Sequence, residues 1–168
     1  RLGMELGYDA VLAALADLGV ERVPPRYPSL FLGAVEMSPL EVAAMYQTAA
    51  NGGFRAQLRT IREVTDGNGA PLARYPVSID ATVTPEDAFL LQFLLARVTG
   101  SGTARSAGAA LGTVQPLGGK TGTTNDLRDS WFAGYAGQLL GVVWVGRDDN
   151  RPTGLSGATG ALPVWIDI

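Results

Sequence analysis

The stretch that decides the fold is Gly118-Gly119-Lys120-Thr121-Gly122-Thr123-Thr124, and its lysine is the only one among the 13 basic residues of the chain. Glycine packs nothing inside a strand, and where it does occur there, a ligand or another backbone often comes close. We interpret the run as an edge-type strand with room for a ligand, which one cation and three hydroxyl groups then face. The plainer alternative is a glycine-rich turn with a solvated lysine.

A phosphate-binding loop is a second alternative, because Gly119-Lys120-Thr121 matches the end of the P-loop pattern Gly-x-x-x-x-Gly-Lys-Ser/Thr. The first glycine of that pattern falls on Val114. A P-loop also leads into a helix, whereas Asn125 and Asp126 break the chain here and strand-like residues 130–135 follow. These two mismatches exclude a P-loop.

Composition narrows the classes of protein. At 168 residues and 46% hydrophobic content, the chain predicts one globular domain. Its net charge of -3 gives no basic face for nucleic acid, and it shows neither a signal peptide nor an apolar run near the roughly 18 residues of a membrane span. Without cysteine or histidine, the chain can hold neither a thiol nucleophile, a Ser-His-Asp triad nor a histidine-ligated zinc. We expect no cofactor and no metal, and a general base must be Lys, Asp, Glu or Tyr, or come from elsewhere.

Helix signals dominate the first two thirds of the chain. Apolar spacing predicts helix over residues 1–18, broken near residue 7 and restarting with Asp9 as N-cap. Ser38 and Glu41 form a capping box that begins a helix reaching residue 49. Thr84 caps another, strongly apolar over residues 88–95 and ending near residue 100, and a short helix is expected over 106–111. Between these, residues 58–64 and 71–75 predict a peripheral hairpin around a Thr-Asp-Gly-Asn-Gly turn.

Strand signals gather near the end of the chain. They predict three antiparallel strands at about residues 117–124, 130–136 and 139–147, followed by a helix over 156–166. This order predicts an α+β fold, with helices layered on an antiparallel sheet. We expect the aromatic residues of these strands to lie in the core: Trp131, Phe132, Tyr135 and Trp144.

Several polar residues outside the glycine-rich stretch are candidates for lesser roles. Thr103 and Arg105 lie on a loop that could border a cleft, and Asp129 is expected to end a turn. Asp126, Asp148 and Asp149 have no spacing typical of a calcium loop, so we interpret them as solvated loop ends.

The stretch at Lys120-Thr121-Gly122-Thr123-Thr124, followed by Asp129-Ser130-Trp131-Phe132-Ala133-Gly134-Tyr135, resembles the third motif of the penicillin-binding transpeptidases. The similarity is greatest to class A, the bifunctional cell-wall synthases. Supporting stretches follow the family's order over nearly the whole chain: Leu2-Gly3-Met4, Leu32-Gly33-Ala34, Ser38-Pro39-Leu40-Glu41-Val42-Ala43, Ala49-Ala50-Asn51-Gly52-Gly53, Gly102-Thr103-Ala104 and Trp144-Val145-Gly146-Arg147-Asp148. The resemblance implies the fold of penicillin-binding transpeptidases and serine β-lactamases, an antiparallel sheet flanked by helices.

The family combines Lys-Thr-Gly with Ser-x-x-Lys, which holds the nucleophile, and with Ser-x-Asn. A Ser-x-x-Lys would need serine at position 117, which is Leu117, and no serine lies two places before an asparagine. Arg1 begins abruptly, as if within a helix. We therefore expect residues 1–168 to be the C-terminal part of one transpeptidase domain that starts after the second motif, and to be inactive alone.

The resemblance assigns roles within the third motif. Lys120 and Thr123 are implied as catalytic: the Thr123 N–H would stabilise the oxyanion, and Lys120 would hold the substrate carboxylate and favour a neutral form of the missing lysine. The Thr121 and Thr123 hydroxyls would bind that carboxylate, and Gly122 would let the substrate approach. Thr124 is the last substrate-binding candidate, with a structural role as its alternative.

The implied function is that of a D,D-transpeptidase, which cross-links peptidoglycan stem peptides ending in D-Ala-D-Ala through a serine acyl-enzyme and is the target of β-lactams. Implied partners are those peptides, β-lactams, the N-terminal half of the same domain and a glycosyltransferase domain, with no nucleic acid. The implied location is the periplasmic face of the bacterial inner membrane, anchored by an upstream segment. Two alternatives stay open: a non-catalytic peptide- or β-lactam-binding module, and a serine β-lactamase-type hydrolase.

Overall fold

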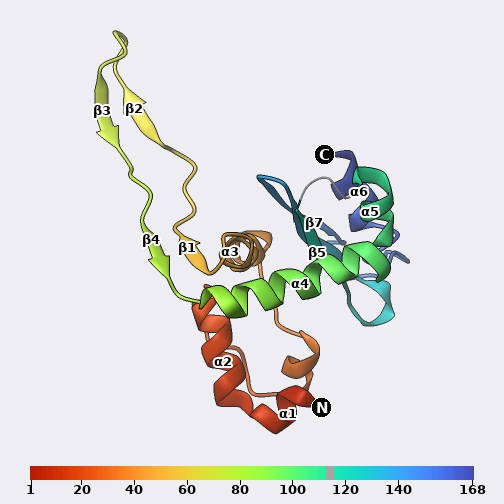
Figure 1. The fold of residues 1–168 in the computed structure, drawn as a ribbon. Helices are drawn as coiled ribbons and strands as arrows, with labels where there is room; N and C mark the ends of the chain where they lie inside the picture. Colours follow the sequence, from red (N-terminus) through yellow and green to blue (C-terminus); the bar gives the residue numbers. More distant parts are fainter. Residues whose placement is uncertain (113–115) are drawn as a thin grey trace.

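A computed structural model describes residues 1–112 and 116–168 (Figure 1), and its elements confirm the predicted α+β class. Three antiparallel sheets form: β1 with β4, β2 with β3, and a three-stranded sheet in the order β5-β6-β7. In chain order the elements are α1 (Leu2–Leu6), α2 (Tyr8–Asp17), the 3-10 helix η1 (Pro28–Leu32), α3 (Pro39–Ala50), β1 (Phe54–Ala56), β2 (Glu63–Thr65), β3 (Pro71–Arg74), β4 (Ile79–Ala81), α4 (Pro85–Ser101), α5 (Arg105–Leu111), β5 (Leu117–Thr123), the 3-10 helix η2 (Asn125–Leu127), β6 (Ser130–Ala136), β7 (Leu139–Val145) and α6 (Ala161–Asp167).

The hydrophobic core lies between the three-stranded sheet and the helices α5 and α6. Phe132 of the central strand β6 is fully buried and meets Trp165 of α6 edge to face, with ring centroids 4.9 Å apart. The other buried members of this cluster are Ala104, Ala107, Ala161 and Leu162. Helix α3 packs against β6 and β7, and α4 lies along β5. The sheet that carries the glycine-rich stretch thus packs against three helices, α3, α4 and α6.

The expectation for the strand aromatics was only partly right. Phe132 and Tyr135 are buried, and Trp131 is half-buried. Trp144 is 41% exposed, so its prediction as a core residue was wrong. Its indole N–H donates to Asp129 Oδ1 over 3.0 Å, and its ring lies against that of its cross-strand partner Trp131 at 6.1 Å. A tryptophan whose N–H needs a partner can satisfy it at the rim of a sheet more easily than in an apolar core.

The helix N-termini follow the cap signals with two exceptions. The capping box of Ser38 and Glu41 and the Thr84 cap are both present. Asp9, however, lies inside the first turn of α2 and pairs with Arg26, while the N-cap position belongs to Gly7. The last helix begins at Ala161 instead of residue 156. Residues 156–160 form a turn before it, with the hydroxyls of Ser156 and Thr159 bonded to its own backbone.

Replacing Ser38 by alanine is expected to lower the free energy of unfolding by about 1 kcal/mol, because the serine satisfies an N-terminal N–H of α3. The hydrogen bonds from the Ser38 N–H and hydroxyl lower the pKa of Glu41. A lowered folded-state pKa means that the carboxylate's contribution is present above the pKa of an unfolded glutamate and is lost as the pH falls through the folded value. Denaturant unfolding at neutral and acidic pH should therefore show the effect shrinking in acid. Ser78→Ala, on an exposed loop residue, is the control, and an equal loss in both variants would contradict the capping role.

The predicted peripheral hairpin is confirmed as β2 and β3, which project from the body of the molecule (Figure 1), although its first strand begins at Glu63 instead of residue 58. Asp66 Oδ1 closes its turn by accepting from the N–H groups of Asn68 and Ala70, each at 2.9 Å. A second pairing, β1 with β4, joins this arm to the body and was not predicted. Strands of three residues are too short for an alternating pattern to mark them.

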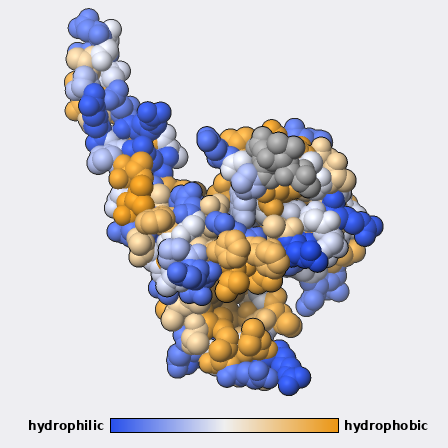
Figure 2. All heavy atoms as spheres, in the orientation of Figure 1, coloured by the Kyte–Doolittle hydropathy of each residue, from blue (hydrophilic) through white to orange (hydrophobic). Residues whose placement is uncertain are grey.

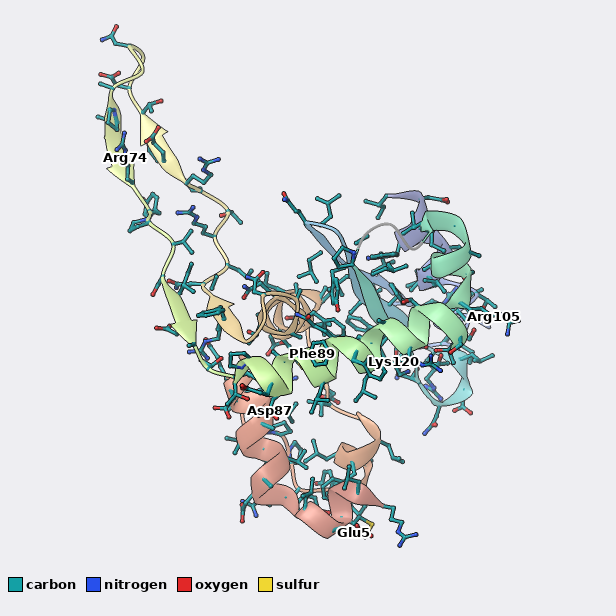
Figure 3. The ribbon with its side chains drawn as sticks, in the orientation of Figure 1. Glu5, Arg74, Asp87, Phe89, Arg105 and Lys120 are labelled. Atoms are coloured by element: carbon teal, nitrogen blue, oxygen red, sulfur yellow. The ribbon has the colours of Figure 1, made fainter. Side chains whose placement is uncertain are left out.

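Helix α4 is apolar around most of its circumference. Ala88 and Thr99 are buried on one side, but four large apolar side chains on the other side are more than half exposed: Phe89, Leu90, Phe93 and Leu94. Apolar surface covers the middle of the face shown in Figure 2, in the region where Figure 3 labels Phe89. A helix that is apolar all round is normally buried all round. None of the helices in the described residues has both the length and the hydropathy needed to cross a bilayer.

Candidate active site

The glycine-rich stretch forms β5, an edge strand of the three-stranded sheet, which confirms the strand and excludes the solvated turn. Strands β5 and β6 pair antiparallel, from Leu117 opposite Ala136 to Thr123 opposite Ser130, which places Lys120 opposite Ala133. At the two ends of the ladder, Gly137 N–H donates to Pro116 O at 2.9 Å and Thr124 N–H donates to Asp129 O at 3.2 Å. The backbone N–H and C=O groups of the even-numbered residues of β5 therefore form the hydrogen bonds to β6. In an antiparallel ladder the residues between them direct their N–H and C=O groups away from the partner strand.

The outward residues of β5 are thus Gly119, Thr121 and Thr123, and their backbone groups line the open edge. Toward the start of the strand the edge is occupied, because Thr99 of α4 donates its hydroxyl to Leu117 O at 3.3 Å. Within residues 1–112 and 116–168, no hydrogen bond takes the N–H of Thr123. An extended chain can add to such an edge as a further strand.

Two of the glycines are required by the packing of the protein itself. A β-carbon on Gly119 would lie 2.6 Å from Phe132 Cζ, and one on Gly118 would lie 2.5 Å from the Tyr135 hydroxyl. At Gly122 the nearest atom, Trp131 Cβ, would be 3.0 Å away, which is tight but less severe. Room for a ligand is therefore not the reason for glycine at positions 118 and 119, where the buried aromatic side chains of β6 set the limit.

Lys120 lies on the strand with an exposed side chain, and Figure 3 shows its label beside the second half of α4. Its Nζ donates to the backbone O of Thr121 at 2.8 Å. Because that oxygen belongs to an outward residue, the ammonium group is held at the open edge. Lys120 forms no ion pair with a carboxylate in the part of the chain that the structure describes. Its positive charge is therefore available to an anion.

Thr123 is exposed, and its hydroxyl oxygen accepts a 2.9 Å hydrogen bond from the N–H of Gly157. Since a hydroxyl has one proton to donate, this contact leaves the Thr123 proton free for a ligand. Gly157 was not among the sequence candidates. A β-carbon there would lie 2.6 Å from Gly122 O and 2.7 Å from Trp131 O, so only glycine lets this segment reach the sheet. No local pattern around residue 157 marks that contact.

Thr121 is half-buried, and its hydroxyl lies 2.7 Å from the hydroxyl of Thr103, on the turn between α4 and α5. Thr103 was named from sequence as a residue that could border a cleft, and it does lie beside the candidate site. Figure 3 shows Arg105 where α5 begins, after that turn. The site is therefore built from β5, the turn after α4 and the segment before α6.

Thr124 has its hydroxyl bound within the protein. The oxygen accepts from Asp129 N–H at 2.8 Å, and the hydroxyl donates to Asp129 Oδ2 at 3.1 Å. These bonds close the connection between β5 and β6, and Trp144 holds the other oxygen of Asp129. These contacts occupy the Thr124 hydroxyl within the protein, as its structural alternative requires, and a substrate-binding role for Thr124 stays a prediction.

The tyrosines and acidic residues bear on acid–base and metal chemistry. Burial raises the pKa of Tyr46 to about 12 and also raises the pKa of Tyr135, so both stay protonated at neutral pH and are poor bases. The hydrogen bond from Arg147 lowers the pKa of Asp149, which also lies near Arg151. Among the described residues, no three acidic side chains come together as a metal site.

Among protein families, the sequence model of the penicillin binding protein transpeptidase domain matches residues 26–153 of this chain. The chain belongs to this family. It is 44% identical over 165 residues to penicillin-binding protein 1B of Vibrio cholerae, covering 98% of this chain and 21% of the relative. The crystal structure of penicillin-binding protein 1A from Haemophilus influenzae superposes with a TM-score of 0.88 at 27% identity, over 97% of this chain and 30% of that one.

A third match extends the likeness of fold. Penicillin-binding protein A from M. tuberculosis, solved as a penicillin G acyl-enzyme complex, has a TM-score of 0.70 at 23% identity, covering 99% of this chain and 43% of that one. The chain thus spans about a fifth of the length of the curated relatives that it matches. The similarity to penicillin-binding proteins 1A and 1B agrees with the class A character suggested by the sequence.

Proposed function

We propose that this chain forms one wall of the active site of a D,D-transpeptidase that cross-links peptidoglycan stem peptides and is acylated by β-lactams. The observation that carries the proposal is the open edge of β5, where the Thr123 N–H and hydroxyl proton and the Lys120 ammonium are available together. A stem peptide ending in D-Ala-D-Ala is an extended chain with a terminal carboxylate. Both of its features match this edge.

The proposed chemistry is acyl transfer. A serine outside this chain gives its proton to a base and attacks the carbonyl carbon of the penultimate D-Ala. The bond to the terminal D-Ala breaks, and that residue leaves with a proton on its amine as the acyl-enzyme forms. An amine of a second stem peptide then attacks the acyl-enzyme, which forms the cross-link and releases the serine. The N–H of Thr123 donates to the oxyanion, and a fixed donor of this kind acts most strongly where charge develops in the transition state. The Thr121 and Thr123 hydroxyls and the Lys120 ammonium bind the terminal carboxylate. Gly122, which pairs with Trp131 toward β6, leaves the strand without a side chain between these two threonines.

The nucleophile is proposed to lie in a part of the parent protein that packs beside this chain. The solved relatives named above continue well beyond the matched region, since the chain covers 30% and 43% of them. The exposed apolar side of α4, which lies along β5, gives such a part a surface to cover. On this proposal, residues 1–168 are the C-terminal part of one transpeptidase domain. A glycosyltransferase domain, a membrane anchor and a location on the outer side of the bacterial inner membrane belong to the proposed parent.

A non-catalytic module that binds peptides or β-lactams is a second candidate, because the sequence contains no Ser-x-x-Lys. Such a module would hold a ligand at the β5 edge without forming a covalent bond. A serine β-lactamase-type hydrolase would instead form the bond and break it quickly.

Labelling with a fluorescent penicillin separates these candidates. The intact parent protein is expected to retain the label after denaturation, and residues 1–168 alone are expected not to be labelled, because the attacking serine lies outside them. The readout is in-gel fluorescence, with an excess of unlabelled benzylpenicillin as the competition control. Covalent labelling of residues 1–168 would overturn the division of the site. A parent that binds without covalent label supports the module, and one that releases the label within seconds supports the hydrolase.

A further inference from the structure

We propose that Thr103 is a positioning residue for carboxylate recognition, acting through the hydroxyl of Thr121. This inference rests on the proposed function and adds a residue outside the Lys-Thr-Gly stretch. The observation that carries it is the 2.7 Å contact between the Thr103 and Thr121 hydroxyl oxygens, in which either oxygen could donate.

The turn that carries Thr103 is tightly built. Gly102 ends α4, and a β-carbon there would lie 2.8 Å from Val98 Cα, so no other residue fits without a shift. The N–H groups of Gly102 and Ala104 both donate to Val98 O, at 3.1 and 3.2 Å. Ala104 is fully buried in the core cluster. Thr103 is therefore an exposed residue between two anchored neighbours, and its backbone is held in place on both sides.

The end of α4 is also fixed to the strand that it serves. The Thr99 hydroxyl, which is buried, lies 3.0 Å from Ala96 O in its own helix and 3.3 Å from Leu117 O at the start of β5. A shift of the turn relative to Thr121 would break this contact. The backbone that carries Thr103 is thus fixed relative to β5, and a rigid support of this kind is what a preorganised site requires.

A bound carboxylate decides the direction of this hydrogen bond. An ionised carboxylate only accepts, so Thr121 must give it its single proton. The Thr121 oxygen then accepts from Thr103, and the Thr103 hydroxyl becomes the first donor of a chain that runs through Thr121 to the carboxylate. Hydrogen bonds in such a chain polarise and strengthen one another. Without the Thr103 hydroxyl, Thr121 loses both the donor that polarises it and the contact that orients it.

The test uses the full-length parent and two probes, benzylpenicillin and its methyl ester, and measures the ratio of their acylation rate constants. Thr103→Val is expected to lower this acid-to-ester ratio about threefold to tenfold, the value of one neutral hydrogen bond, and Thr103→Ser is expected to restore it. Ser101→Ala is the matched control, because its hydroxyl bonds to Arg97 O within α4; the ratio should not change. A purely structural defect would slow both probes equally and would overturn the proposal.

A double variant tests whether Thr103 acts through Thr121. If it does, Thr103→Val should have no further effect on the ratio in a Thr121→Val background. A further loss would mean that Thr103 contacts the carboxylate itself, which would overturn the positioning role. A parent that no β-lactam acylates would overturn the proposed function and this inference together. A parent that is acylated with a carboxylate preference, which Thr103→Val leaves unchanged, would overturn this inference alone.

Discussion

Replacing Thr123 by valine is expected to slow acylation of the parent protein by benzylpenicillin about tenfold to a hundredfold. Valine keeps the shape of the side chain but removes the hydroxyl, whose proton is free because its oxygen already accepts from Gly157 N–H. A hydrogen bond to a charged group contributes about 1.5–3 kcal/mol, and each 1.4 kcal/mol is a factor of ten in rate. Stopped-flow or gel-based measurement of the second-order acylation rate constant gives the number.

Three further variants make this result specific to Thr123. Thr123→Ser keeps both hydrogen bonds, the one accepted from Gly157 N–H and the one donated to the substrate, and should retain most of the rate. Thr60→Val makes the same change on an exposed residue of the projecting arm and should have no effect. Thr124→Val should act mainly on stability, since its hydroxyl serves Asp129. An unchanged rate in Thr123→Val would refute its contact with the substrate carboxylate.

Replacing Phe132 by alanine is expected to lower the free energy of unfolding by about 3–5 kcal/mol, the usual cost of removing a buried phenylalanine side chain. Phe132 is fully buried, it packs edge to face on Trp165, and it is the nearest of the neighbours that leave no room for a side chain at Gly119. Its loss opens a cavity directly beneath β5. Denaturant unfolding followed by fluorescence measures the change.

The control for this stability effect is Phe54→Ala, which removes the same side chain from a position that is 48% exposed. Its cost should be smaller, because about half of its surface stays in contact with water in the folded protein. Equal losses in the two variants would show that the core between the sheet and α6 does not depend on Phe132. A Phe132→Ala protein that keeps its stability would contradict the packing described here.

Much of the fold could be predicted because its signals are local. The Ser38 and Glu41 capping box, the Thr84 cap and the β5 glycines each depend on residues within a few positions of one another. The N-cap of α2 and the start of the last helix were misplaced by a few residues, because local sequence patterns fix the ends of a helix only loosely and packing decides them. Trp144 was misplaced because alternation along a strand fixes which face a side chain takes, but not whether anything covers that face.

By itself the sequence determined that Lys120, Thr121 and Thr123 share one strand. It also determined that these 168 residues contribute neither a histidine nor a cysteine to the site and do not contain the nucleophilic serine motif. Only the tertiary structure decided which backbone groups face the open edge, since that depends on the register between β5 and β6. It also decided the partners of the two threonine hydroxyls, Thr103 and Gly157, which lie 18 and 34 positions away. A hydrogen bond across such a distance is fixed by how helices and strands pack together, and no short pattern of residues encodes it.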